Sequence, residues 1–121
     1  MEGVKDKNVQ YAVCTEPSDV ADEISLKSWN LVLCSDDVVC MQVVEILNEN
    51  HLEIGRGVKI ASFHDSVLLE SHVPSISAVK VDAYALGEKS SELSLNLVKG
   101  EKCESVNYVD CSFAMRASTG E

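Results

Sequence analysis

Short apolar runs alternate along this chain with stretches of helical periodicity, and this alternation limits the possible folds more than any other feature. Runs typical of strands cover residues 9–14, 31–34, 58–63, 76–81 and about 106–115. Helical patterns cover residues 18–27, with Ser18 as the N-cap, then 36–50, a short turn at 67–69, and 83–99. Strands that alternate with helices predict an α/β fold, here a three-layer α/β/α sandwich around a mostly parallel sheet. The continuously apolar 31–34 run is typical of a central strand, and the alternating 76–81 run of an exposed or edge strand.

Length and charge narrow the function classes. The chain has 121 residues, enough for one compact domain or a piece of a larger protein, and we expect a single unit over residues 1–121. Its formal charge of −10 repels phosphate, so these residues alone are not expected to grip DNA, RNA or an anionic membrane. Residues 1–10 are polar and charged, and no apolar run approaches the roughly 18 residues of a membrane span. We therefore expect a cytoplasmic protein without a secretion signal.

The five cysteines are odd in number and have no CxxC spacing. Cys14, Cys34 and Cys40 lie within apolar stretches, which favours buried, reduced thiols over a zinc site or a disulfide framework. We expect neither a metal nor a cofactor.

The helix predicted over residues 36–50 carries more apolar side chains than one face requires. They are Val38, Val39, Cys40, Met41, Val43, Val44, Ile46 and Leu47. A single apolar stripe is enough to cover one side of a sheet. The surplus predicts that this helix has a second partner.

Five blocks of sequence, in order and with fitting spacing, resemble the carboxyl-terminal part of the LacI/GalR family of bacterial transcription regulators. They are residues 34–37 (CSDD), 58–65 (VKIASFHD), 74–82 (PSISAVKVD), 86–87 (LG) and 116–120 (RASTG). The corresponding family patterns are C-x-N-D, I-S-V-V-G-(F/Y)-D-(D/N), P-P-L-T-T-(I/V)-x-Q-(D/P), L/M-G and R-x-S-T-G. The resemblance covers about 90 of the 121 residues and implies one lobe of a type I periplasmic-binding-protein-like fold.

The same resemblance implies a function. The whole protein would close two lobes over a small-molecule effector, often a sugar, and would bind DNA through an amino-terminal helix-turn-helix. That motif, the hinge helix, the first lobe and the helix with R-x-x-G-(F/Y) are absent from the sequence, and we expect an excised second lobe rather than a natural remnant. It would contribute effector sensing and a homodimer interface, formed by the 36–50 helix and the turn after the third strand. The interface residues expected are Val39, Val43, Ile46, Val67 and Leu68.

The helix over residues 83–99 crosses to the other lobe in the family. Without that lobe, its face with Leu86, Leu93 and Leu97 is expected to pack on this lobe or on a partner chain, including by domain swapping.

Ligands of open α/β sheets bind beyond the carboxyl ends of the strands, where Asp36, Asp37, His64 and Asp65 fall. One carboxylate accepts hydrogen bonds from two neighbouring hydroxyls, so these residues suit a sugar. Helix capping is the alternative role for Asp36 and Asp37, and the two roles are compatible. His64 stands where the family has a ligand-contacting Asp, and Asp36 where it has Asn. Both departures bear on sugar specificity, and a solvated loop position is the alternative for His64.

Other functions fit the sequence less well. Ser35, Asp36 and His64 are the three residue types of a hydrolase triad. No G-x-S-x-G turn presents the serine, however, so we predict that the chain is not an enzyme. A divalent cation site at Asp36, Asp37, His64 and Asp65 would lack any calcium loop or H-E-x-x-H pair. Two alternatives stay open: a half-lobe of a solute-binding protein for uptake, and a truncated interaction module that pairs with a full repressor.

Overall fold

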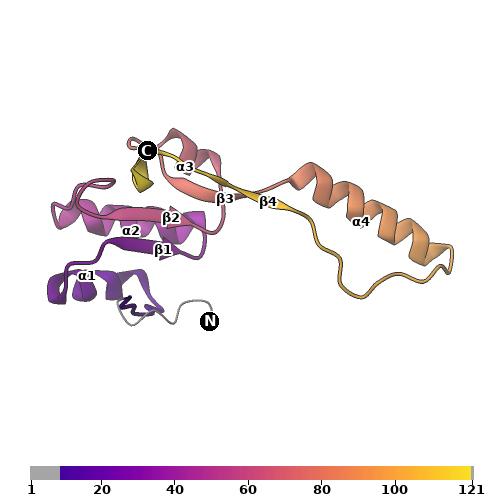
Figure 1. Cartoon of the computed structure of the whole chain (residues 1–121), viewed down its shortest axis with the longest axis horizontal. Coiled ribbons are helices and arrows are strands. Elements are labelled where there is room, and N and C mark those ends of the chain that lie inside the picture. The colour runs from indigo at the N-terminus through magenta and orange to yellow at the C-terminus, as the bar shows by residue number, and fades with distance from the viewer. Residues whose placement is uncertain (1–8, 121) are drawn as a thin grey trace.

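The computed structural model describes residues 9–120, and most of the polar opening at residues 1–10 lies outside this range. The helices are α1 (Pro17–Leu26), α2 (Asp37–Glu49), α3 (Val67–Ser71) and α4 (Ala83–Val98), followed by the short 3-10 helix η1 (Ala117–Thr119). The strands are β1 (Leu31–Cys34), β2 (Lys59–Ser62), β3 (Ser77–Val81) and β4 (Cys111–Ala114). Figure 1 shows two regions: a body that holds the sheet and α1–α3, and an arm, residues 82–110, made of α4 and the segment that runs back from it.

The four strands form one sheet in the order β1-β2-β3-β4. β1, β2 and β3 are parallel, and β4 runs antiparallel to β3, so the predicted α/β class with a mostly parallel sheet is confirmed. The expected positions of two strands are wrong. β4 returns from the arm beside β3 and makes it an inner strand, whereas β1 lies at the edge of the sheet. Residues 9–14 do not form the expected strand, because they are exposed and pair with no strand in the described range.

Local signals set the helix ends. The Asp36 carboxylate accepts a hydrogen bond from the Val39 N–H at 2.8 Å, and Asp82 caps α4 in the same way at the Ala85 N–H, at 2.9 Å. α4 stops where Gly100 adopts a φ of 77°, a left-handed conformation that glycine takes without steric cost. The N-cap of α1 is Glu16, two residues before the expected Ser18, and its N–H donates to the Asp19 carboxylate at 3.2 Å.

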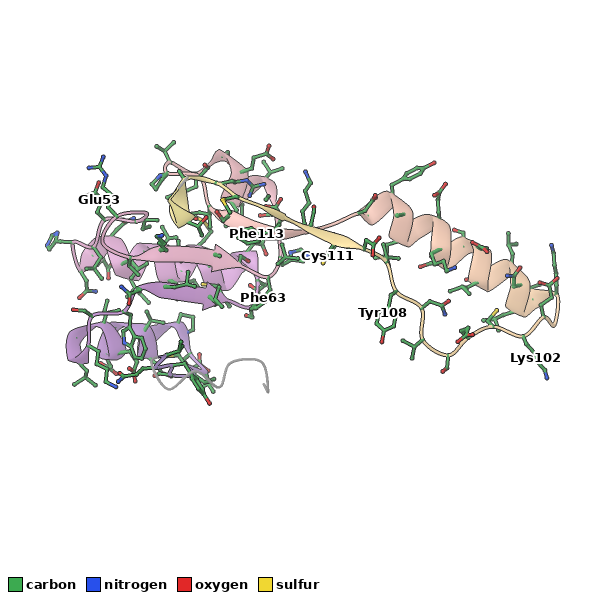
Figure 2. The ribbon with its side chains drawn as sticks, viewed as in Figure 1. Glu53, Phe63, Lys102, Tyr108, Cys111 and Phe113 are labelled. Carbon is green, nitrogen blue, oxygen red and sulfur yellow. The ribbon has the colours of Figure 1, made fainter. Side chains whose placement is uncertain are left out.

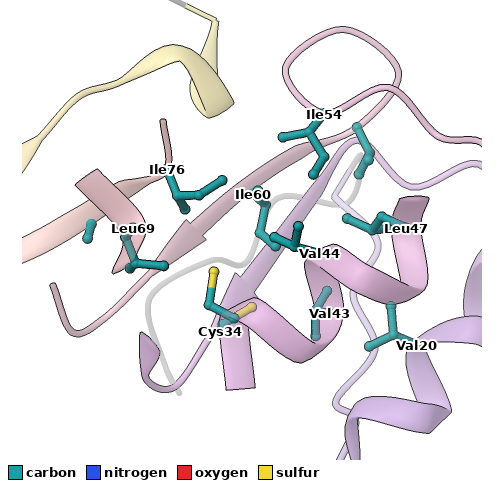
Figure 3. Close-up of a cluster of buried hydrophobic side chains, with 12 residues drawn as sticks. Val20, Cys34, Val43, Val44, Leu47, Ile54, Ile60, Leu69 and Ile76 are labelled. Carbon is teal, nitrogen blue, oxygen red and sulfur yellow. The ribbon is translucent and has the colours of Figure 1, made fainter. Parts of the chain in front are cut away.

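The hydrophobic core lies on one face of the sheet, beneath α2 and α3 (Figure 3). Cys34 and Ile60 reach it from the strands, Val43 and Leu47 from α2, and Leu69 from α3. Cys34 and Cys40 are buried free thiols, as expected, and the neighbouring Cys40 thiol together with burial raises the pKa of Cys34. Cys14 is exposed, so the prediction that it is buried is wrong.

The opposite face of the sheet is buried at Ala61 and Ser77, where residues 116–119 lie against it, but much of the rest is exposed within residues 9–120. Side chains alternate along a strand, so Leu31 and Leu33 point away from the core and are exposed. Phe63 and Phe113 are also exposed, from the end of β2 and from β4 (Figure 2). The described residues therefore supply two of the three expected layers.

The arm buries nothing of its helix. α4 contains no buried residue, and Leu86 and Leu97 are exposed. Figure 2 shows Lys102 at the tip of the arm and Tyr108 on the returning segment, both away from the body. The expectation that the leucine face packs on this lobe is therefore wrong within this chain.

Candidate functional site

Two loops meet at the carboxyl ends of β1 and β2. These strands are parallel and pair Cys34 with Ser62, so the residues that follow each strand are neighbours. The His64 Nδ1 atom lies 3.8 Å from Asp37 Oδ1 across the two loops. The structure thus brings Asp36, Asp37 and His64 to one edge of the sheet, the edge toward which β3 leads into the arm.

Asp36 acts first as the cap of α2. Its Oδ1 atom accepts the Val39 N–H, and its Oδ2 atom lies 3.5 Å from the Ser35 hydroxyl. The capping role is therefore confirmed, and contact with a ligand stays a prediction.

Asp37 is the more electrostatically perturbed of the two carboxylates. Its pKa is lowered, chiefly by the neighbouring Ser66 hydroxyl, then by backbone N–H groups at the start of α2 and by His64. The Ser66 oxygen is buried and forms no hydrogen bond among the described residues. Asp37 is therefore a half-buried anion at neutral pH.

His64 combines a fixed backbone with a free ring. The Ser62 hydroxyl donates to the His64 carbonyl at 2.7 Å and accepts from the His64 N–H at 3.1 Å. The side chain itself is 66% exposed. The ring is therefore presented to solvent from a rigid support.

Asp65 already has a strong partner inside the chain. Arg116 donates from Nη1 to Oδ1 at 2.7 Å and from Nη2 to Oδ2 at 2.8 Å, a bidentate pair. Arg116 also lowers the pKa of this carboxyl. Both oxygens are engaged, so the structure gives Asp65 a supporting position beside the other three residues. Arg116 is not among the expected site residues, although the R-x-S-T-G block contains it.

The expected dimer residues have different exposures. Val67 and Leu68 are exposed on α3, and Val39 and Ile46 are half-buried on α2. Val43 is only 2% exposed and belongs to the core, so its side chain cannot reach a partner. Val38, not among the expected residues, is exposed and lines a shallow groove with Met41, Glu45 and Leu68.

Residues 9–120 contain neither a metal-binding cluster nor a membrane-spanning helix. Within this range, no three His, Cys, Asp or Glu side chains cluster so that they could hold a metal ion. No helix of the same range is long and apolar enough to cross a membrane.

Comparisons with known proteins agree with the fold and the sequence blocks. A family model described as the periplasmic binding protein-like domain matches residues 2–119. The HTH-type transcriptional regulator RegA of Clostridium saccharobutylicum is 24% identical over 83 residues, which cover 69% of this chain and 25% of that protein.

Solved structures of transcription regulators share the fold. The lac repressor dimer bound to operator and the anti-inducer ONPF superposes with a TM-score of 0.74 at 18% identity, over 86% of this chain and 32% of that one. A periplasmic binding protein/LacI transcriptional regulator from Alkaliphilus metalliredigens, complexed with D-xylulofuranose, superposes with a TM-score of 0.72 at 20% identity. The match covers 85% of this chain and 38% of that one. This chain thus spans about a quarter to two-fifths of the proteins it matches.

The resemblance to LacI/GalR regulators is thereby confirmed, and because the family model covers residues 2–119, the chain belongs to the periplasmic binding protein-like domain family.

Proposed function

We propose that this chain is the second lobe of the effector-sensing domain of a LacI-type transcription regulator. The observation that carries the proposal is the meeting of Asp36, Asp37 and His64 at the carboxyl edge of a parallel sheet, which is where ligands of such sheets bind. The DNA-binding head and the first lobe would be contributed by other residues of a longer protein.

The arm supports this function. In the family the corresponding helix crosses to the first lobe, and here α4 leaves the body with its leucines exposed. Binding of an effector between the lobes would favour the closed arrangement, because the ligand has more contacts there, and so would shift the population of lobe arrangements. A change in lobe arrangement would alter the spacing of the two DNA-binding heads in a dimer.

Local charge indicates the class of effector. Asp37 is an anion, Asp36 is a second carboxylate, and Asp65 is neutralised by Arg116. This edge therefore disfavours phosphorylated or carboxylated ligands and suits a neutral molecule rich in hydroxyl groups. The relative with bound D-xylulofuranose supports a sugar.

An NMR titration of the chain with neutral sugars and with sugar phosphates tests the proposal. We expect weak binding, at roughly millimolar Kd, because half a cleft leaves most of a ligand solvated. Shifts are expected at residues 35–37 and 63–66 with neutral sugars and not with phosphates. Asp37→Asn should abolish them, whereas the control Asp22→Asn on α1 should not. Shifts confined to other segments, or stronger shifts with phosphates, would contradict the proposal.

The same chain would also form the homodimer interface. Val38, Val67 and Leu68 form an exposed apolar surface on α2 and α3, which fits a second copy of the chain. Sedimentation should show a dimer that Val38→Asp shifts toward monomer, whereas the control Val98→Asp on the arm should not. A chain that is monomeric at high micromolar concentration would refute the interface.

Specific binding of DNA is expected to require a DNA-binding head outside these 121 residues. The chain has a formal charge of −10, so it should not retard duplex DNA at physiological salt. Sequence-selective retardation of duplex DNA by this chain alone would contradict the proposal that a separate head binds DNA.

A further inference from the structure

Arg116 connects the carboxyl-terminal end of the chain to the loop after β2. Besides its two bonds to Asp65, its Nη1 atom donates to the Ile76 carbonyl at 2.7 Å. The side chains of Arg116 and Asp65 are 13% and 14% exposed. A bidentate pair this well shielded fixes both the distance and the orientation of its partners.

The backbone around Arg116 is itself anchored. Its N–H donates to the Ser77 hydroxyl at 2.7 Å, and that hydroxyl lies 2.7 Å from Thr119 Oγ1. Two residues on, the Ser118 hydroxyl accepts from the Ser77 N–H and donates to the Ile60 carbonyl at 2.6 Å. Residues 116–119 are therefore attached to both β2 and β3, and the guanidinium projects from a rigid base.

From Asp65 the connection continues to the candidate site. Asp65 Oδ1 also accepts the Ser66 N–H at 2.9 Å, and Ser66 lies beside Asp37. His64, whose ring faces Asp37, is the residue immediately before Asp65. The loop that carries His64 is thus held at one end by Ser62 and at the other by Arg116.

We infer that Arg116 is a positioning residue for the candidate site: its paired bonds to Asp65 hold residues 63–66 so that the His64 ring faces Asp37. The inference rests on the proposed function only in treating this loop as the effector side of the lobe. The positioning itself is a property of the chain without ligand.

Amide hydrogen exchange of the 121-residue chain, followed by NMR, tests the inference. Arg116→Lys keeps the positive charge but loses the planar fork that pairs with both carboxylate oxygens. We expect the amides of residues 64–66 to exchange about tenfold faster, while the protected amides of α2 and β2 keep their rates, because the opening is local. The His64 ring resonances should shift, with the His51 ring as internal reference. Arg56→Lys is the matched control, since Arg56 is exposed and forms an exposed ion pair with Glu53, and it should change none of these signals.

A second variant keeps the test valid if Arg116→Lys unfolds the chain. Asp65→Asn retains the size of the side chain and removes the ion pair, and it should accelerate exchange at the same amides. The double variant should be no faster than the faster single variant, because both remove one interaction. Unchanged exchange at residues 64–66, or an equal acceleration in α2 and β2, would overturn the positioning role. Since no ligand is added, this outcome is independent of the sugar titration that tests the proposed function.

Discussion

The body and the arm each contain a helix with a well-formed N-cap, but only the helix of the body is buried against other elements. α2 in the body and α4 in the arm each start at an aspartate that caps the N–H three residues on, at 2.8 and 2.9 Å. α2 buries Cys40, Val43, Val44 and Leu47, whereas α4 has no buried residue. The local signals that start a helix, such as its cap, are therefore separate from the contacts that fix its position. Those contacts come from the elements against which the helix packs.

The two regions also differ in how their returning segments are held. In the body, Ser118 is buried and bridges β2 and β3, and Arg116 pairs with Asp65. In the arm, the returning segment is held to α4 near the end of the helix, by the Glu101 N–H on the Asn96 carbonyl at 2.9 Å and by a long contact from Cys103 Sγ to the Leu93 carbonyl at 3.9 Å. Stability should consequently be concentrated in the body, and three matched pairs of substitutions and one replacement of the arm test this.

Matched leucine truncations should give the largest difference. Leu47 is fully buried and Leu97 is 63% exposed, so Leu47→Ala opens a cavity and Leu97→Ala does not. We expect Leu47→Ala to lower the free energy of unfolding by about 3 kcal/mol, and Leu97→Ala by less than about 0.5 kcal/mol. Urea unfolding of both variants measures this. Equal losses would mean that the arm is packed in solution.

Removal of the guanidinium should give the next largest effect. Arg116→Met leaves Asp65 without its partner and should cost about 3 kcal/mol at pH 7. Arg56→Met, the exposed control, should cost less than about 0.5 kcal/mol.

The pH dependence of that difference has a defined sign. Arg116 lowers the folded-state pKa of Asp65, so the stabilisation is present above the unfolded carboxyl value of about 4 and is lost as the pH falls through the lower folded value. The gap between wild type and Arg116→Met should therefore be widest near neutrality and narrow in acid. A gap that widens on acidification would show that another interaction dominates.

Replacement of the arm should have a smaller effect, and of opposite sign. Val81 and Cys111 face each other in the β3–β4 ladder, so an Asn-Gly turn in place of residues 82–110 would make a two-residue hairpin. Shortening the connection lowers the entropy cost of closure, and we expect a gain of about 1 kcal/mol in the free energy of unfolding. Thermal unfolding by circular dichroism measures it, and loss of the folded body would show that the arm supports it.

Paired cap removals should give the smallest difference. Asp36→Ala should cost about 1 kcal/mol of global stability, because α2 unfolds with the core. Asp82→Ala should fray α4, with faster amide exchange at its first turn, and leave the global unfolding midpoint unchanged. A shared drop in midpoint would indicate that the two regions unfold together.

Much of the fold could be predicted from the sequence because its signals are local. The cap at Asp36, the stop at Gly100 and the apolar runs gave the positions of α2, α4 and β1 to within a residue or two. The strand order could not be read in this way, because β4 returns to β3 only after the whole arm. Residues 9–14 have a strand-like composition but pair with no strand in the described part of the chain, and composition alone does not supply a partner.

In the candidate site, too, the features set by local sequence could be predicted and those set by distant residues could not. Asp36, Asp37 and His64 follow parallel strands, so their proximity could be predicted from strand direction. The structural role of Asp65 could not, because its partner Arg116 lies 51 residues further along the chain. Val43 was expected at the dimer interface but lies in the core. Helical periodicity shows that α2 has apolar residues in excess, but not which of them face the sheet.

The pairing of Val81 with Cys111 has a consequence for the order of folding. The connection through α2 also closes a long loop between β1 and β2, and closing a loop costs chain entropy. The side chains that α2 buries as it forms offset this cost. The connection through the arm closes a comparable loop without burial, and β4 itself is mostly exposed. We therefore expect the parallel strands and α2 to form the folding nucleus and β4 to join after the rate-limiting barrier, with φ-values near zero at Ser112 and Phe113.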